Sequence, residues 1–166
     1  TSYVLSPGVR LLGGADLILC GRQTTDGDTA QVGPAIAEHL HMPHAAWVSE
    51  IVETGAEAIT VRQDLASVTQ VSRIPYPCLI TVDKDMCVPR LPSYLLKKET
   101  KGRPVRFMGF ADMPDQDLSR YGLIGSPTAV ERMFAPPEVE KKVYLTGDPK
   151  EKTEKLFLAL SGKKLI

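Results

Sequence analysis

The stretch that decides the fold covers residues 17–31 and reads LILCGRQTTDGDTAQ. Its first four residues form a short, continuously apolar run, which is typical of a strand buried on both faces of a parallel sheet covered by helices. Gly21 ends that strand, and a polar loop that contains a second glycine follows it. Asp28 or Thr29 is expected to cap the next helix, because their side-chain oxygens accept the unpaired N–H groups of a helix start. The stretch therefore predicts a strand, a loop and a helix in succession.

The rest of the chain also divides into helix-like and strand-like patterns. A helix is predicted from Thr1 or Ser2 to the glycine pair at 13–14. Strands are predicted at 45–52, 58–62, 67–72 and 78–82, with a hairpin turn at 53–55. Towards the end, a strand at 143–145 is expected to precede a helix that Asp148 caps.

Composition and charge exclude several classes of function. The chain has 166 residues, of which 43% are hydrophobic and 24% charged, as in soluble domains and unlike disordered or fibrous proteins. Twenty basic residues balance twenty acidic ones, so neither nucleic acid nor an anionic membrane is expected as a partner. No apolar run approaches the ~20 residues that cross a bilayer. Three cysteines without a Cys-x-x-Cys spacing indicate a reducing cytoplasm, and the start without Met indicates that an amino-terminal part is missing.

The loop and the helix after it form the strongest candidate site. A helix start carries unpaired N–H donors and a partial positive charge, which together favour a phosphate group. Gly21 and Gly27 would let the backbone approach such a ligand closely. Asp26 and Asp28, in contrast, would repel it unless loop N–H groups occupy their carboxylates, and the loop lacks both Gly-x-Gly-x-x-Gly and a P-loop lysine. A phosphate site and a well-capped turn both remain open.

Other chemistry-bearing residues support no competing site. His39 and His41 point to different sides of a helix, so we expect these two and His44 to bind no zinc. The two loop aspartates lack an apolar pocket that would separate their pKa values for acid/base catalysis. Ser126 lacks the Gly-x-Ser-x-Gly context of a hydrolase nucleophile. We therefore name no catalytic side chain and no metal ligand.

A basic, proline-bearing stretch at 83–104 is expected to be an exposed loop with one helical turn. It combines apolar and basic residues: Leu91, Tyr94, Leu95, Leu96, Lys97, Lys98, Lys101 and Arg103. Exposed apolar groups rimmed by charge are typical of docking surfaces, but a basic loop is often simply solvated. Both interpretations remain open.

Several segments together resemble a known family. Residues 20–34, CGRQTTDGDTAQVGP, are similar to the nucleotide-binding loop of the beta subunit of electron transfer flavoprotein. Residues 77–82, PCLITV, and 88–94, VPRLPSY, resemble the strand and the partner-recognition loop that follow it in that family. The resemblance extends through residues 125–128, GSPT, to the terminal helix, while family members extend further on the amino side.

The resemblance implies a fold and a domain organisation. It implies an α/β fold with a Rossmann-like parallel sheet, helices on both faces, a β-hairpin excursion and a carboxyl-terminal arm, of the adenine nucleotide alpha hydrolase-like kind. Residues 1–142 would form a partial nucleotide-binding domain that includes the recognition loop 88–104. Residues 143–166 would form the arm.

The resemblance also implies a cofactor and partners. The chain would be the beta subunit of a heterodimer with an alpha subunit, and it would hold FAD, as in electron-bifurcating, NADH-linked members, or AMP, as in ordinary ones. The residues at 26–34 and 125–128 resemble the bifurcating group more. Electrons would pass between NADH or an acyl-CoA dehydrogenase and other acceptors such as ferredoxin. The cofactor-binding residues would be Gly21, Arg22, Gln23, Asp26, Gly27, Asp28, Thr29, Ala30, Gln31 and Val32.

The resemblance further implies a docking role for the recognition loop, which would insert into an acyl-CoA dehydrogenase or a similar flavoprotein. The partner-recognition residues would be Arg90, Leu91, Pro92, Ser93, Tyr94 and Leu95. Tyr94 stands where the family usually places leucine. Two alternatives stay open: an adenine-nucleotide-binding regulatory module resembling universal stress proteins, without redox activity, and a structural subunit with an empty site.

Overall fold

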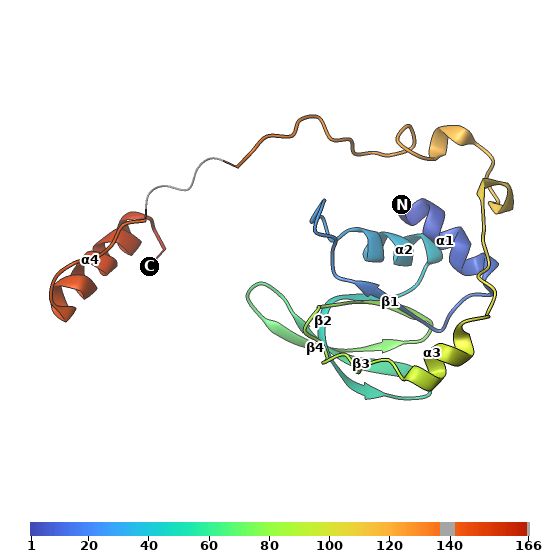
Figure 1. The fold of residues 1–166 in the computed structure, drawn as a ribbon, viewed down its shortest axis with the longest axis horizontal. Coiled ribbons are helices and arrows are strands. Elements are labelled where there is room, and N and C mark those ends of the chain that lie inside the picture. Colours follow the sequence, from blue (N-terminus) through green and yellow to red (C-terminus); the bar gives the residue numbers. More distant parts are fainter. Residues whose placement is uncertain (137–141, 166) are drawn as a thin grey trace. The chain divides into compact units, whose positions relative to one another are not determined.

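The structure is a computed structural model that describes residues 1–136 and 142–165 (Figure 1). The chain forms two compact units, Thr1–Ser126 and Pro127–Ile166. Among the described residues, all strands lie in the first unit, and the long helix α4 (Pro149–Gly162) lies in the second. No helix of the described residues is long and apolar enough to cross a membrane. The predicted division at 142/143 stays a prediction.

The first unit contains a five-stranded sheet with the order β1-β5-β2-β3-β4. Strands β1 (Leu17–Gly21), β5 (Cys78–Val82) and β2 (His44–Thr54) run parallel. Strands β3 (Ala58–Asp64) and β4 (Thr69–Pro75) follow as antiparallel neighbours of β2. The α/β, Rossmann-like class is confirmed. The sheet is mixed because the predicted hairpin excursion, closed by the Gly55 N–H and the Ala58 carbonyl at 2.9 Å, extends the same sheet.

Two helices lie together on one side of the sheet, α1 (Ser2–Leu11) and α2 (Val32–Leu40) (Figure 1). Helix α2 packs on β5 and β2, where Ile36, Ala37 and Leu79 form a buried cluster. Gly33 lets the helix approach closely, since a Cβ at this position would lie 2.4 Å from Thr81 Cγ2. This close packing fixes the start of α2 directly above the end of β5.

Strand β5 is the central strand of the parallel part and is buried on both faces. Leu79 faces α2, whereas its neighbours Cys78 and Ile80 belong to a second cluster with Val48 and Val61. The expectation of burial on both faces is wrong for β1. Among the described strands β1 is at the edge of the sheet, so Leu19 is 57% exposed. An edge position cannot be distinguished from a central one by apolarity alone.

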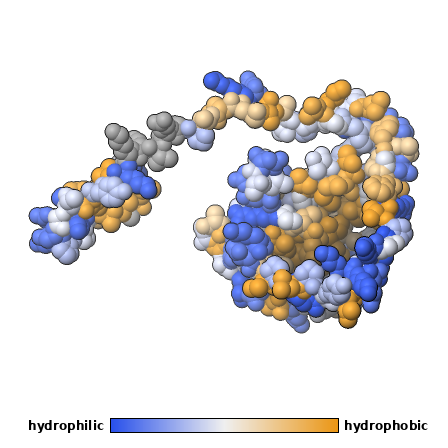
Figure 2. Space-filling model, viewed as in Figure 1, coloured by the Kyte–Doolittle hydropathy of each residue, from blue (hydrophilic) through white to orange (hydrophobic). Residues whose placement is uncertain are grey.

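Beyond the sheet and the two helices beside it, the described part of the first unit contains further short helical segments. These are α3 (Tyr94–Thr100) and two 3₁₀ turns, η1 (Phe110–Asp112) and η2 (Leu118–Arg120). The predicted helical turn in the basic stretch is thus confirmed as α3, which has no buried residue. Figure 2 shows apolar and hydrophilic groups side by side on the visible face of the molecule.

In the second unit, one prediction is confirmed and one is wrong. The Asp148 side chain caps α4 by accepting the Glu151 N–H at 2.8 Å, as predicted. The predicted strand at 143–145 is not formed, and Val143 and Tyr144 are 85% and 81% exposed. A strand requires a neighbour to satisfy its backbone groups, and the described residues place none beside this segment.

Candidate functional site

The candidate site lies where β1 and β5 end side by side. Gly21 pairs with Val82 at the last position of the parallel ladder, and the Arg22 N–H donates to the Val82 carbonyl at 3.0 Å. Ligands of open α/β sheets bind beyond the carboxyl ends of the strands, and this edge carries a pocket of about 660 Å³. It is lined by Gly21, Arg22, Gln23, Thr25, Val82, Asp83, Lys84, Met86, Cys87 and Pro89. This volume falls in the range of small-molecule sites.

The loop after β1 folds on itself, and donors within the loop form hydrogen bonds with its two carboxylates. The Asp28 N–H donates to the Thr24 carbonyl at 3.1 Å, which closes a turn. Asp26 accepts the Gly27 N–H at 2.8 Å, and hydrogen bonds from Thr24 and Gly27 lower the pKa of Asp26. The Gln23 side-chain amide donates to the Asp28 carboxylate. Asp26 is therefore engaged by a loop N–H group, which was the condition for a phosphate to be tolerated here, whereas Asp28 is engaged by a side-chain amide instead.

Helix α2 begins later than the sequence predicts. Its first residue is Val32 and its N-cap is Gln31, which makes no side-chain capping bond. Asp28 and Ala30 have φ values of 51° and 54°, in the left-handed region, so the chain at these positions does not enter a right-handed helix. The prediction that Asp28 or Thr29 caps the helix is therefore wrong. The helix start, which leaves N–H groups without intrahelical partners, therefore lies at Gln31 and Val32 rather than at Asp28 or Thr29.

The best-defined side chain of the pocket is Arg22. Its guanidinium carbon lies 4.4 Å from the centre of the Trp47 ring, in cation–π contact. Its Nη1 lies 2.8 Å from Asp83 Oδ2, and this hydrogen bond is the largest contribution that lowers the pKa of Asp83. Its Nε is buried, and no hydrogen-bond partner for it exists among the described residues. Arg22 is thus fixed by one side chain from β2 and one from the residue that directly follows β5.

The predicted cofactor residues divide into two groups in the structure. Gly21, Arg22 and Gln23 line the pocket, together with Thr25. The predicted residues from Asp26 to Val32 form the turn and the helix start next to this lining, and they do not line the pocket themselves. Sequence analysis missed Trp47, Asp83, Lys84, Met86 and Cys87. The signal for Asp83 was available, because it directly follows an apolar strand parallel to the first.

The predicted partner-recognition residues lie together, apart from this pocket. Ser93 is the N-cap of α3, where its hydroxyl accepts the Leu96 N–H at 3.5 Å. Arg90 to Ser93 and the first turns of α3 line a shallow depression of about 410 Å³. Leu91 and Tyr94 are 88% and 76% exposed. The structure thus presents these apolar groups to solvent beside Lys97 and Lys98.

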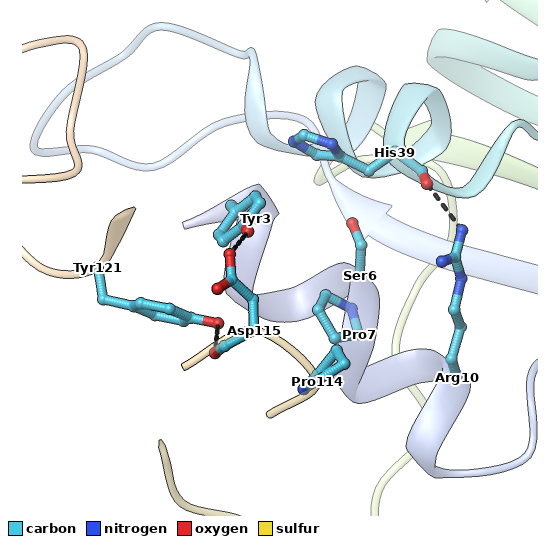
Figure 3. A pocket seen from close by; sticks show the side chains of 8 residues that line it. All are labelled: Tyr3, Ser6, Pro7, Arg10, His39, Pro114, Asp115 and Tyr121. Atoms are coloured by element: carbon cyan, nitrogen blue, oxygen red, sulfur yellow. Dashed lines mark hydrogen bonds between the residues drawn. The ribbon is translucent and has the colours of Figure 1, made fainter. Parts of the chain in front are cut away.

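A second, smaller pocket of about 200 Å³ lies against α1 (Figure 3). The Tyr3 hydroxyl donates to the Asp115 carboxylate and lowers its pKa, and Arg120 Nη1 lies 3.3 Å from the same carboxylate. The Tyr121 hydroxyl donates to the Asp115 backbone carbonyl at 2.7 Å. These contacts fasten the segment around η1 and η2 to α1.

The His39 carbonyl accepts a hydrogen bond of 2.9 Å from Arg10 Nη2, and no described cluster of metal-ligand residues surrounds the His39 ring.

Comparison with known proteins agrees with the resemblance. The model of the electron transfer flavoprotein domain matches residues 1–108. The acryloyl-CoA reductase electron transfer subunit gamma of Anaerotignum propionicum is 36% identical over the whole chain and 64% of its own length. The electron transfer flavoprotein subunit beta of Megasphaera elsdenii is 36% identical over 83% of this chain and 53% of its own. The caffeyl-CoA reductase-Etf complex subunit CarD of Acetobacterium woodii is 35% identical over 89% of this chain and 55% of its own.

The chain spans about half to two thirds of the length of these curated relatives. The matched region includes β1, the loop after it, β5 and the recognition segment, which are the parts that build the two surfaces described above. The chain belongs to the beta-subunit family of electron transfer flavoproteins.

Proposed function

We propose that this chain is a nucleotide-binding subunit of an electron-transferring flavoprotein heterodimer. It would hold an adenine nucleotide, FAD or AMP, at the carboxyl edge of β1 and β5 and pass electrons between a donor such as NADH and a partner flavoprotein. The observation that carries the proposal is the pocket at this edge, with a glycine-bearing loop on one side and a helix start beside it. The cytoplasm is the proposed location.

The residues present fit a nucleotide. The pocket volume of about 660 Å³ suits a nucleotide moiety, and the loop carboxylates are already engaged by Gln23, Thr24 and Gly27. The Gly27 position leaves room for close approach, because a Cβ there would meet no protein atom within 4 Å. Val82 and Met86 give the pocket an apolar wall against which a flat ring can pack.

Each part of the site has a separate task. The N–H groups at Gln31 and Val32 would bind anionic oxygens, because the positive end of the α2 dipole lies there. Gly21 keeps the chain at the end of β1 free of a side chain that would fill the pocket. FAD, when bound, supplies the redox chemistry, so the chain contributes position and electrostatics rather than an acid or base. For that reason no catalytic side chain is assigned.

The exposed surface at 90–101 is the proposed docking site for an acyl-CoA dehydrogenase or a similar flavoprotein. The names of two relatives, an acryloyl-CoA reductase subunit and a caffeyl-CoA reductase complex subunit, support a partner that reduces a CoA ester. Leu91, Tyr94 and Leu95 would enter an apolar hollow, while Lys97 and Lys98 would meet acidic groups at its rim.

The direct test is the nucleotide content of the protein purified with its alpha subunit. Denaturation followed by chromatography and quantitation should release two FAD per pair if this chain holds FAD, or one FAD and one AMP if it holds AMP. NADH-dependent reduction of ferredoxin together with a second acceptor would then separate bifurcation from simple electron transfer. A pair that releases no nucleotide beyond the alpha-subunit flavin would contradict the proposal. ATP or AMP without any flavin would favour a regulatory module.

Gly27→Val isolates the contribution of the loop. Because a Cβ at Gly27 meets nothing within 4 Å, the substitution should leave the unfolding free energy within about 0.5 kcal/mol of wild type. It should nevertheless empty the site, since the branched side chain occupies the space through which a ligand would approach the backbone. Equilibrium dialysis with AMP and with FAD measures the occupancy. Full nucleotide occupancy in a normally stable variant would show that the loop is not part of the binding site.

A further inference from the structure

We infer that Trp47 and Asp83 are positioning residues, which hold the Arg22 guanidinium as a receptor for a phosphate group in the pocket at the carboxyl ends of β1 and β5. The inference rests on the proposed function, because it assigns these side chains to the nucleotide site. Both residues lie outside the loop that the sequence pattern identified, Trp47 on β2 and Asp83 directly after β5.

Trp47 has an unusual backbone conformation for a residue inside a strand. Its φ is 60°, in the left-handed region that bulky residues rarely adopt. The register between β2 and β5 shifts here, between Ala45 and Val48. The Trp47 N–H donates to the hydroxyl of Thr81 on β5 at 3.0 Å, and Thr81 is itself 1% exposed. Strained residues persist only where surrounding contacts hold them, and they concentrate at functional sites.

The strained backbone places the indole ring against Arg22. The guanidinium carbon lies 4.4 Å from the ring centre, and Asp83 holds Nη1 at 2.8 Å. A contact with a ring fixes the plane of a guanidinium, and a contact with a carboxylate fixes its direction within that plane. Together, these contacts from β2 and from the end of β5 leave Arg22 with one orientation at the pocket wall.

One donor of this fixed guanidinium has no acceptor. Arg22 Nε is buried without a hydrogen-bond partner among the described residues, and such orphaned donors are rare in folded proteins. Arginine presents Nε–H beside a terminal N–H as a planar fork that matches two oxygens of a phosphate. The carboxylate of Asp83 repels a phosphate less than a free carboxylate would, because it is already engaged by Arg22 and by the Lys84 N–H, at 2.7 Å. Nε itself is buried, so a phosphate in the pocket would be held by the terminal N–H groups of Arg22 that Asp83 does not engage.

The experiment uses the fact that Trp47 is the single tryptophan of the chain. The 166-residue chain is titrated with AMP, adenosine and inorganic phosphate while the Trp47 emission is recorded. AMP should change the emission and should bind at least tenfold more tightly than adenosine. Inorganic phosphate should change the emission at higher concentration, which separates the phosphate contact from the adenine contact.

Variants separate positioning from simple structural support. Arg22→Gln and Asp83→Asn should reduce the affinity for AMP about tenfold while leaving the affinity for adenosine within twofold. By dialysis, Trp47→Leu should show the same selective loss, and Trp47→Phe, which keeps a ring, should recover most of it. Arg62→Gln is the matched control, because it removes an exposed pair between Arg62 on β3 and Glu50 on β2, neither of which lines the pocket.

Three outcomes would overturn the inference, and they are distinguishable. If AMP binds but Arg22→Gln and Trp47→Leu weaken AMP and adenosine equally, these residues only support the fold, and the proposed function stands. If AMP binds without any change in Trp47 emission and with unaltered affinity in the Arg22→Gln variant, the phosphate lies elsewhere. If the wild-type chain binds neither AMP nor FAD, the proposed function fails together with the inference.

Discussion

The contact between Gly33 on α2 and Thr81 on β5 gives the sharpest prediction for stability. A Cβ added at Gly33 would lie 2.4 Å from Thr81 Cγ2, 3.5 Å from Cys20 Cβ and 3.6 Å from Leu79 Cδ2. The last two distances are ordinary contacts, whereas the first is roughly 1 Å shorter than carbon atoms tolerate. In Gly33→Ala, either α2 moves away from the sheet or Thr81 rotates.

Both routes are unfavourable. Moving the helix disturbs the packing of Leu79, and overpacking of a core typically destabilises by about 1–3 kcal/mol. Rotating Thr81 carries its hydroxyl away from the Trp47 N–H, and a lost buried hydrogen bond is of similar size, about 0.5–1.5 kcal/mol or more. Alanine favours a helix over glycine by at most about 1 kcal/mol, which offsets part of this effect. We therefore expect Gly33→Ala to lower the unfolding free energy by about 1–2 kcal/mol.

The partner substitution makes the prediction specific. Thr81→Ser removes Cγ2 and keeps the hydroxyl that accepts from Trp47, so Gly33→Ala in that background should be neutral or stabilising by up to about 1 kcal/mol. Urea unfolding followed by Trp47 emission measures all four proteins of the cycle. Gly8→Ala is the control, because a Cβ at Gly8 would lie 4.0 Å from the nearest side-chain atom. This substitution should stabilise α1, since alanine favours a helix over glycine. Equal destabilisation in both Thr81 backgrounds would refute the reasoning.

Three further predictions concern the pocket and the docking surface. The Arg22 hydrogen bond lowers the pKa of Asp83 below its ordinary value of 3.8. The pair therefore stabilises the folded protein above pH 3.8, and this stabilisation is lost as the pH falls through the lower pKa of the folded state. In urea unfolding, the free energies of wild type and Asp83→Asn should differ at pH 7 and converge in strong acid. Cys87 is exposed and lines the pocket, whereas burial raises the pKa of the Cys78 thiol. A thiol reagent should therefore label Cys87 first, and bound AMP or FAD should slow that labelling. An unchanged labelling rate with saturating nucleotide would contradict the pocket assignment. Tyr94→Ala should slow electron transfer to the partner flavoprotein in stopped-flow measurements at unchanged nucleotide content, and unaltered rates would remove the docking proposal.

Local patterns predicted most elements of the first unit. The apolar run at 78–82 coincides with β5. A hairpin joins β2 to β3 as predicted, although β2 runs to Thr54 and the turn therefore lies at 55–57 rather than at 53–55. Asp148 caps α4 as its position before a proline indicated. These predictions succeeded because strand burial, turn chemistry and helix capping depend on neighbouring residues in the chain.

One prediction failed because of the local geometry of a turn, and two others failed because the outcome depended on distant residues. The start of α2 shifted to Val32 because Asp28 and Ala30 adopt left-handed conformations within a turn that folds on itself. The strand expected at 143–145 found no neighbour among the described residues, so its apolar side chains lie exposed. Burial of β1 was overestimated for the same reason, because its place in the strand order decides how much of Leu19 is covered.

The sequence by itself determined the class of the fold, the glycine-bearing loop after the first strand, and the family resemblance, since each of these is encoded in residues close together along the chain. Only the tertiary structure brought together Trp47 on β2, Arg22 directly after β1 and Asp83 directly after β5. The parallel order of these strands places the ends of β1 and β5 level with Val48 of β2, and the register shift beside Val48 includes Trp47, whose ring lies against Arg22. No local pattern specifies such an arrangement, because it depends on which strands become neighbours after the chain has folded.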